Sequence, residues 1–423
     1  MSNNLDDSII RRSLFLLLLV VPAYGMNFLF LIISGRLFET KAFGIFYTSL
    51  SLINILIAPT IILNLFFARR ITLASIVGTH AAMGEFRYLL KKIWQWGIRM
   101  ALLVCFFMLL LSTTLHLESG LIVIMIVLTS YSVYFTESTR AVLQGLKKFT
   151  LLGIETVSWT SLRLLLGISG ILLIEKPWGG LLGISFSALI IFVLFYYLLI
   201  DKYSAGMDSY DQVEAVDIKE LIWFCSSYVI FICIMYLDNM VAFVTFDRLN
   251  LGIYSKACIL SKSIVLLTTP IIQVFFPVMV DRNAKSQIGR VEIAKSFVLT
   301  LLMIGFIGAF VCLFPDFVAH DVLGMDEGYG KLIMVVFLSA VPLCCLRILV
   351  LLQLSRGLDK HPLLIFPLLV IQTILLFSLG SNPVQFAWVF TISCWGIFVF
   401  YGLICFYRNI IGRHFFGFSK GRD

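Results

Sequence analysis

The sequence places ionisable side chains inside long apolar stretches, where a charge without a partner costs free energy. In "ETVSWTSLR" (155–163), Glu155, Trp159 and Arg163 follow one another at intervals of four residues. This spacing aligns them on one face of a helix, with Glu155 about 12 Å from Arg163 along the axis, too far for a direct ion pair. Arg163 could bind a phosphate through two parallel hydrogen bonds while Trp159 stacks on a ring of the same ligand, or Arg163 could pair with an acid of a neighbouring helix.

Three further basic residues lie within apolar stretches and are candidates for the same kind of ligand. Lys256 and Lys262 are separated so that their side chains diverge by about 120° around a helix, and Lys262 lies about two turns deeper. Arg347 lies about two turns from the end of its stretch, within reach of a phosphate. Snorkelling of a long side chain toward the membrane surface explains Lys256 and Arg347 equally well.

Carboxylates inside the apolar stretches point to ion coupling, because a buried carboxylate can change its protonation between two conformations. Asp238 lies deep in "MYLDNMVAF", and Glu155 is the second candidate. Glu137 lies three positions before Arg140, which predicts a local structural ion pair. The nine cysteines all lie in apolar stretches without ligand spacing, so we expect neither a metal site nor a cofactor.

The elements that hold these residues must be membrane helices. Of the 423 residues, 60% are hydrophobic and 13% are charged, and the mean hydropathy of +1.00 is too high for a soluble domain. A helix needs about 20 apolar residues to cross a bilayer. Twelve stretches meet this requirement: residues 13–34, 43–67, 96–115, 120–138, 150–174, 178–200, 221–246, 251–280, 293–314, 331–353, 361–380 and 386–407. The sequence therefore predicts an all-α integral membrane protein with about 12 transmembrane helices.

Lysine and arginine residues predict the orientation of these helices. Most of the 32 basic residues lie in the short connections on the side that holds both termini, a bias typical of cytoplasmic loops. The net charge of +8 is spread over these loops, so it does not indicate binding of nucleic acid. We therefore expect a multi-pass membrane protein with both termini in the cytoplasm.

The chain divides into two halves with the same number of apolar stretches. The acidic, polar segment 201–220 separates residues 1–200 from residues 221–423 and is typical of a cytoplasmic linker between two lobes. "FGIFY" (43–47) and "LGIYS" (251–255) open the second stretch of each half, and a proline follows each about four turns later. Parallel repeats of this kind predict two six-helix lobes related by a pseudo-two-fold axis along the membrane normal, with a central cavity between them.

Three motifs resemble those of the Wzx-type O-antigen and polysaccharide flippases, which belong to the multidrug/oligosaccharidyl-lipid/polysaccharide exporter superfamily. They are "GRLFETKAFGIFY" (35–47), "RAVLQGLKKF" (140–149) and "LGIYSKA" (251–257). The positions of the first motif that fit the family pattern are Gly35, Arg36, Phe43, Gly44 and Tyr47. The usual Leu, Gly and Pro of the family are replaced here by Phe38, Glu39 and Thr40. The resemblance covers essentially the whole chain through motif order and helix number.

The resemblance implies transport by alternating access of an undecaprenyl-pyrophosphate-linked oligosaccharide, an O-antigen (lipopolysaccharide) or other surface polysaccharide unit, across the bacterial inner membrane. Membrane lipids and other polysaccharide assembly proteins are then the expected partners, and no cofactor is implied. The implied cavity is cationic and aromatic, with Arg163 on the pyrophosphate and Trp159 on a sugar. Arg36 lies where a headgroup or pyrophosphate could reach it, although a turn with snorkelling charges explains it as well.

Two other classes of protein are alternatives. A cation-coupled multidrug antiporter of the same superfamily shares the architecture, but we expect it to carry acids rather than bases in its membrane helices. A membrane enzyme needs a catalytic loop or domain, and the sequence contains no nucleotide-binding Gly-rich loop, metal motif or nucleophile elbow. We therefore expect a transporter rather than an enzyme.

Overall fold

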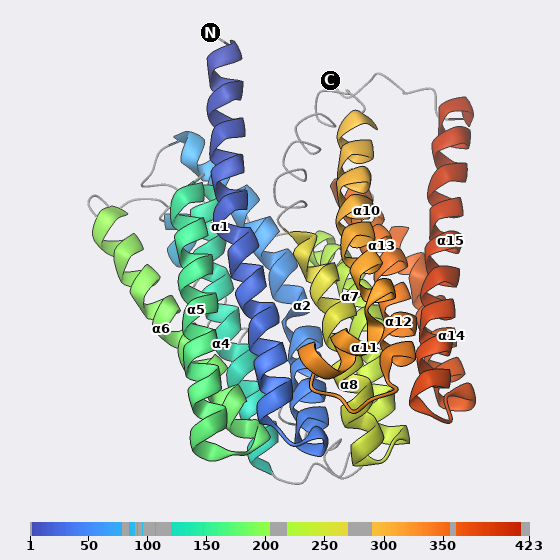
Figure 1. The fold of residues 1–423 in the computed structure, drawn as a ribbon. Coiled ribbons are helices and arrows are strands. Elements are labelled where there is room, and N and C mark those ends of the chain that lie inside the picture. The colour runs from blue at the N-terminus through green and yellow to red at the C-terminus, as the bar shows by residue number, and fades with distance from the viewer. Residues whose placement is uncertain are drawn as a thin grey trace.

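The computed structural model of the chain is almost entirely helical in the residues that it describes (Figure 1). These are residues 2–77, 84–88, 91, 95, 106, 120–146, 148–203, 218–269, 290–355 and 361–415. Apart from residue 106, the predicted stretch 96–115 lies outside them, as do most of the predicted linker and the end of the stretch 251–280.

The helices follow the apolar stretches because a bilayer offers the backbone no hydrogen-bond partner outside a helix. In the first half they are α1 (Ser2–Leu37), α2 (Thr40–Val77), α4 (Gly120–Gly145), α5 (Phe149–Ile174) and α6 (Pro177–Tyr203). In the second half they are α7 (Ile218–Thr245), α8 (Arg248–Leu267), α10 (Arg290–Leu313), α11 (Pro315–Phe317), the π-helical turn η1 (Val318–Val322), α12 (Gly330–Leu338), α13 (Ala340–Ser355), the 3-10 turn η2 (His361–Ile365), α14 (Phe366–Leu379) and α15 (Pro383–Phe415).

Nine helices in the described part of the chain are long and apolar enough to cross a membrane. A tenth span results if Phe297–Leu313 and Pro315–Val322, which are bent by 93° relative to each other, count as one, and Leu363–Leu379 is a shorter apolar helix. Every predicted stretch other than 96–115 overlaps one of these helices, the stretch 251–280 only as far as Leu267. The chain is therefore a multi-pass membrane protein, as predicted.

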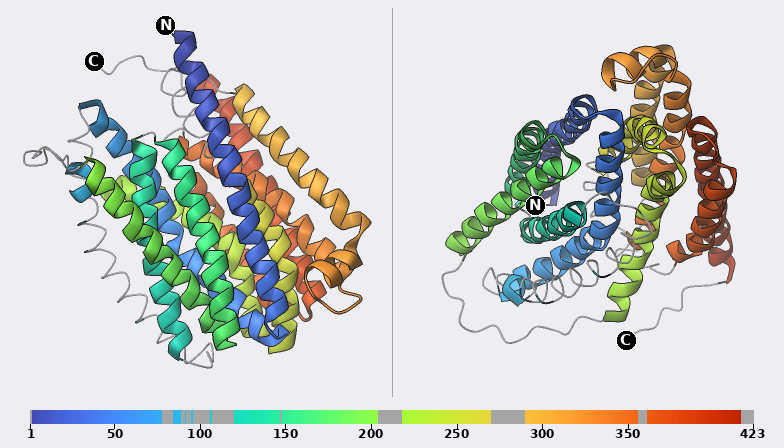
Figure 2. Two further views of the ribbon diagram at one scale, coloured as in Figure 1. Left: turned by 60° about the vertical axis from the view of Figure 1, so that its left-hand side comes forward. Right: turned by 90° about the horizontal axis from the view of Figure 1, so that it is seen from below.

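The helices of the two halves lie side by side, with α2 and α7 where they meet (Figure 1). α2 packs against α4 and α6 of its own half and against α7 and α8 of the other, while α1 packs against α5 and α8. α1 begins and α15 ends at one end of the bundle, here called the terminal end, and the opposite end is the distal end (Figure 2). This arrangement agrees with the predicted even number of membrane crossings.

The starts of α2 and α8 come into backbone contact at the distal end. A Cβ atom on Gly44 would lie 2.9 Å from the backbone nitrogen of Gly252, and a Cβ atom on Gly252 would overlap the carbonyl oxygen of Thr40. Glycine is required for so close an approach of two backbones. Asp247 fixes the start of α8 by accepting a hydrogen bond from the backbone N–H of Leu249 at 3.2 Å. The two repeat motifs thus contact each other across the halves.

Candidate functional site

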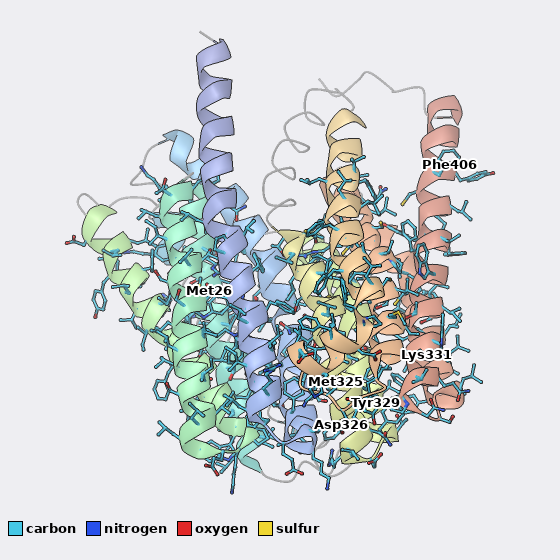
Figure 3. All side chains as sticks on the ribbon, in the orientation of Figure 1. Met26, Met325, Asp326, Tyr329, Lys331 and Phe406 are labelled. Atoms are coloured by element: carbon cyan, nitrogen blue, oxygen red, sulfur yellow. The ribbon has the colours of Figure 1, made fainter. Side chains whose placement is uncertain are left out.

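Arg163 lies on α5 at the middle of the bundle. Ser161, half a turn away, donates a hydrogen bond to the sulfur of Met26 on α1 at 3.3 Å, and Met26 lies near mid-height in Figure 3. The guanidinium carbon of Arg163 is 5.2 Å from the ring centre of Phe30, and its Nε has no hydrogen-bond partner. Among the residues that the structure describes, no carboxylate is within ion-pairing distance of it. The side chain is therefore a cation held against an aromatic ring.

Arg347 contributes a second cation, from α13 in the second half. Its Nη1 donates hydrogen bonds to the carbonyl oxygen of Val265 at 2.7 Å and to the hydroxyl of Thr268 at 3.1 Å, and its Nη2 donates to the hydroxyl of Tyr228 at 3.4 Å. Val265 lies in the last turn of α8, whose carbonyl groups carry the negative end of the helix dipole. The side chain of Arg347 is buried, and none of the described carboxylates pairs with it.

Tyr236 of α7 lies within the electrostatic reach of both arginines. The charges of Arg163 and Arg347 both act on the tyrosine, and Lys262 Nζ lies 5.1 Å from the centre of its ring. Helix α5 of the first half and helices α8 and α13 of the second thus place three cations around one tyrosine of α7, on which the charge of Asp238 also acts. We call Arg163, Arg347, Lys262 and Tyr236 the cationic centre. No sequence signal marks Tyr236, because a tyrosine in an apolar stretch resembles any other buried aromatic residue.

The charge of Lys262 is compensated inside the second half. Its Nζ lies 2.6 Å from Asp238 Oδ1, and the hydroxyl of Tyr254 donates a hydrogen bond to Oδ2 at 2.7 Å. Both charged side chains are almost fully buried. The sequence analysis treats Lys262 and Asp238 separately, as ligand-binding and ion-coupling residues, whereas the structure joins them in one ion pair. Their functional roles stay predictions, and the cations of the cationic centre without a carboxylate partner in the described residues are Arg163 and Arg347.

Glu155 and Trp159 lie nearer the terminal end of α5 and contact α4. Glu155 is fully buried, accepts a hydrogen bond from Thr139 at 2.8 Å, and has its Oε2 3.5 Å from Arg140 Nε. The guanidinium of Arg140 lies 4.5 Å from the ring centre of Trp159 and 2.7 Å from Glu137. The predicted ion pair of Glu137 and Arg140 is therefore present, and Arg140 also lies within ion-pairing distance of Glu155. Ligand binding by Trp159 and ion coupling by Glu155 stay predictions.

Arg36 and Lys256 lie at the distal end, beside the loop that follows η1. Arg36 Nε donates a hydrogen bond to the carbonyl oxygen of Val322 at 3.2 Å, and Lys256 Nζ donates one to that of Gly324 at 2.8 Å. Gly324 has a φ of +61°, a left-handed conformation that favours glycine. Asp326 follows in the same loop at the distal end of the second half (Figure 3). The two cations hold this loop, and their part in substrate binding stays a prediction.

The cationic centre has the chemistry of an anion-binding site. Each guanidinium offers hydrogen-bond donors in a planar fork that matches the oxygens of a phosphate. A cation that is buried without a carboxylate also gains most from an anionic ligand, because the ligand supplies the missing counter-charge. In the described ranges no group of three or more His, Cys, Asp or Glu side chains is placed to hold a metal ion.

Comparison with known proteins rests on solved structures, since no family model and no curated protein matches the sequence. A structure of MATE in complex with MaD3S aligns with a TM-score of 0.68 at 14% identity, over 94% of this chain and 95% of that chain. The inward-facing conformation of a multidrug resistance MATE family transporter of the MOP superfamily gives 0.63 at 14% identity, over 91% of this chain and 94% of that one. A MOP superfamily transporter from Pyrococcus furiosus Vc1, described by the reverse polarity of its binding pocket, gives 0.65 at 12% identity, over 93% and 95%.

These alignments cover almost the full length of both partners and identify the architecture. MATE transporters have twelve transmembrane helices in two lobes, and the described helices of this chain match that arrangement. The predicted fold class is therefore confirmed. The chain has the fold of the MATE transporters of the MOP superfamily, the superfamily to which the Wzx-type flippases also belong.

Proposed function

We propose that the chain is an alternating-access transporter whose cargo is an amphiphile with a phosphate-bearing, anionic headgroup. The observation that carries this proposal is the cationic centre, in which Arg163 of the first half and Arg347 of the second have no carboxylate partner in the described residues. Within this class we infer the cargo of the Wzx-type flippases, an undecaprenyl-pyrophosphate-linked oligosaccharide that moves to the outer leaflet of the inner membrane. Polysaccharide assembly proteins are the partners that this cargo implies.

The energetics of buried charge support an anionic cargo. A buried charge without a counter-charge is unfavourable, so the buried Arg347 and the half-buried Arg163, which have no carboxylate partner in the described residues, favour an anionic ligand. A pyrophosphate has two phosphoryl groups, and each can accept hydrogen bonds from one guanidinium fork. Hydrogen bonds to charged groups contribute about 1.5–3 kcal/mol each. A cationic cargo would instead add positive charge to a site that already has an excess of it.

The contacts between the halves support transport by alternating access. Solved structures of the same fold include inward-facing and outward-facing conformations. In this chain the halves join at the distal end through Gly44 and Gly252, and through the hydrogen bond from Arg36 to Val322. With both termini in the cytoplasm, we infer that the transporter is closed on its outer side, and that cargo reaches the cationic centre from the cytoplasm.

A cation-coupled multidrug antiporter is the second candidate function. One similar structure is a multidrug resistance transporter, and the two acids Glu137 and Glu155 share a single Arg140 in the first half. Two guanidiniums that pair with no carboxylate in the described ranges argue against a cationic drug. The Pyrococcus furiosus transporter, whose reversed pocket polarity suggests a different function for that protein, has a similar fold, so this fold is compatible with pockets of different charge.

Leaflet exchange of a purified undecaprenyl-pyrophosphate oligosaccharide in liposomes tests the proposal. We expect faster exchange with the protein than in empty liposomes, loss of most exchange with Arg163→Ala, and partial recovery with Arg163→Lys, which restores the charge without the fork. Lys331→Ala removes a positive charge at an exposed site at the distal end and serves as the matched control (Figure 3). If several native lipid-linked glycans fail to exchange while small organic cations leave the liposomes in response to a pH gradient, the flippase hypothesis is refuted and the antiporter hypothesis is favoured.

A further inference from the structure

The segment between α10 and α12 forms a strap at the distal end of the second half (Figure 1). The strap consists of α11, η1 and the loop that follows, residues 315–329. Leu323 donates a backbone hydrogen bond to the carbonyl oxygen of Val318 at 3.0 Å, and Met325 donates one to that of Ala319 at 2.9 Å. Such wide turns are rare, and π-helical turns are frequent at functional sites. The strap is therefore a candidate for a functional segment rather than a simple connection.

Two cations, one from each half, hold the strap by its carbonyl groups. Arg36, at the end of α1, donates from Nε to the carbonyl oxygen of Val322 at 3.2 Å, and Lys256 of α8 donates from Nζ to that of Gly324 at 2.8 Å. Arg36 also lies against Gly324, where a Cβ atom would be 3.1 Å from the Cγ of the arginine. The charge of Arg36 acts on Lys256, so the two cations lie close together. Their mutual repulsion favours a negatively charged partner between them.

Neither cation forms an ion pair with a carboxylate in the described part of the chain. Asp326 of the strap acts on Lys256 through its charge alone. A phosphate carries full negative charges, whereas a carbonyl oxygen carries only a partial one, so a phosphate attracts both cations more strongly than the strap does. Arg36 is exposed, and its guanidinium fork suits two oxygens of a phosphate.

Both cations lie closer to the distal end than the cationic centre does. Lys256 precedes Lys262 on α8 by six residues, and Arg36 follows Phe30, the ring beside Arg163, by six residues on α1. Six residues of a helix span about 9 Å along its axis. α1 runs toward the distal end and α8 runs away from it, so both intervals lead in the same direction (Figure 1). A phosphate group that moves from the cationic centre to the distal end therefore reaches the level of these two cations.

We propose that Arg36 and Lys256 form a second anion site, here called the exit site, which binds the phosphate group of the departing cargo in place of the strap. This inference rests on the proposed function and adds the step by which the headgroup leaves. In the structure the carbonyl oxygens of the strap occupy the exit site, and the distal end is closed. When a phosphate takes over both cations, the strap loses two hydrogen bonds and moves away together with Asp326, whose negative charge repels the cargo. Arrival of the cargo at the exit site thus opens the distal end.

Hydrogen exchange of the strap amides, measured by mass spectrometry on the purified full chain, tests the exit site. Undecaprenyl pyrophosphate should accelerate exchange in peptides that cover residues 318–325 by about 5- to 150-fold, because it replaces two hydrogen bonds that hold the strap. Undecaprenol, which has the same chain without a phosphate, should have no effect. Inorganic pyrophosphate distinguishes a free anion from a lipid headgroup. Acceleration by both probes shows that the anion alone displaces the strap, and acceleration by the lipid only shows that the chain delivers the anion; either result supports the exit site.

Variants of the two cations show whether the response arises at the exit site. Arg36→Gln/Lys256→Gln removes both charges and keeps long polar side chains, so strap exchange should no longer respond to the probes. Lys331→Gln removes an exposed charge at the same end of the molecule and should keep the full response (Figure 3). Because Lys256 is buried, Arg36→Gln alone serves if the double variant fails to fold. It should reduce the acceleration by about 2- to 12-fold, the contribution of one hydrogen bond.

The proposal is overturned if neither pyrophosphate probe accelerates strap exchange in the wild type, if undecaprenol acts equally well, or if Arg36→Gln/Lys256→Gln responds like the wild type. Failure of the proposed function gives a different result, because the lipid then binds no better to the wild type than to Arg163→Ala/Arg347→Gln. A strap that does not respond while the lipid still binds at the cationic centre refutes the exit site alone.

Discussion

Replacing one member of the buried ion pair of Lys262 and Asp238 tests whether each residue neutralises the charge of the other in the second half. Their atoms lie 2.6 Å apart, and the side chains are 2% and 0% exposed. Lys262→Met leaves the Asp238 carboxylate buried without its counter-charge, so we expect the free energy of unfolding to fall by about 3–5 kcal/mol. Asp238→Asn strands the ammonium group and also weakens the hydrogen bond from Tyr254, so a loss of similar size is expected.

The double variant Lys262→Met/Asp238→Asn distinguishes charge compensation from simple packing. Replacing both members of a buried ion pair by neutral groups is often neutral or stabilising, so most of the single-variant loss should be recovered. The interaction energy of the double-mutant cycle should then exceed the loss of either single variant, that is, more than about 3 kcal/mol, measured by reversible unfolding in mixed detergent micelles. Lys331→Met, at an exposed site, controls for the loss of one lysine. Losses that simply add in the double variant would refute the reasoning.

The remaining predictions concern the contacts between the halves at the distal end. Gly252→Ala should lower the free energy of unfolding by about 1–3 kcal/mol, because the new Cβ overlaps the carbonyl oxygen of Thr40. Thermal unfolding measures this loss. Gly402→Ala is the control, because its Cβ would meet open space. Arg36→Ala removes the hydrogen bond to Val322, worth about 0.5–1.5 kcal/mol, so backbone hydrogen exchange in the loop after η1 should accelerate about 2- to 12-fold. An unchanged exchange rate would contradict the assigned contact.

Membrane helices can be predicted from this sequence because the bilayer imposes their length and apolarity. The stretch 150–174, for example, becomes α5 at nearly the same residues. The stretch 331–353 instead becomes two helices, α12 and α13, with a break at Ser339. Hydropathy carries no signal for that break, since both parts are apolar, but Pro342 does, because proline lacks the N–H that would bond the carbonyl oxygen of Leu338. The bend of 93° before Pro315 likewise lies at a proline, directly after the end of the predicted stretch 293–314.

Ion pairs between helices are the part of the site that the sequence does not reveal. Glu137 and Arg140 are predictable because neighbours at that spacing meet on one helix. Asp238 and Lys262 lie on α7 and α8, and Arg140 and Glu155 on α4 and α5, so their pairing depends on how those helices pack. Their position inside apolar stretches shows from the sequence alone that these charged residues need partners. Which residues those partners are follows only from the tertiary structure.

Arg163 illustrates how the structure bears on two interpretations of one residue. The sequence leaves open an acid on a neighbouring helix or a ligand as the source of compensating charge. In the described ranges no acid pairs with Arg163, and its guanidinium carbon lies 5.2 Å from the ring centre of Phe30. We therefore infer that a bound ligand supplies the counter-charge of Arg163.

Binding of undecaprenyl pyrophosphate to the purified protein is the measurement that tests the central claim most directly. The wild type should bind it, and Arg163→Ala/Arg347→Gln should bind it at least 10- to 100-fold more weakly, about 1.5–3 kcal/mol for each charged hydrogen bond lost. Binding of a lipophilic organic cation should not weaken in the same variant. Equal binding of the anion by wild type and double variant, or tight binding of the cation alone, would contradict an anionic cargo at the cationic centre.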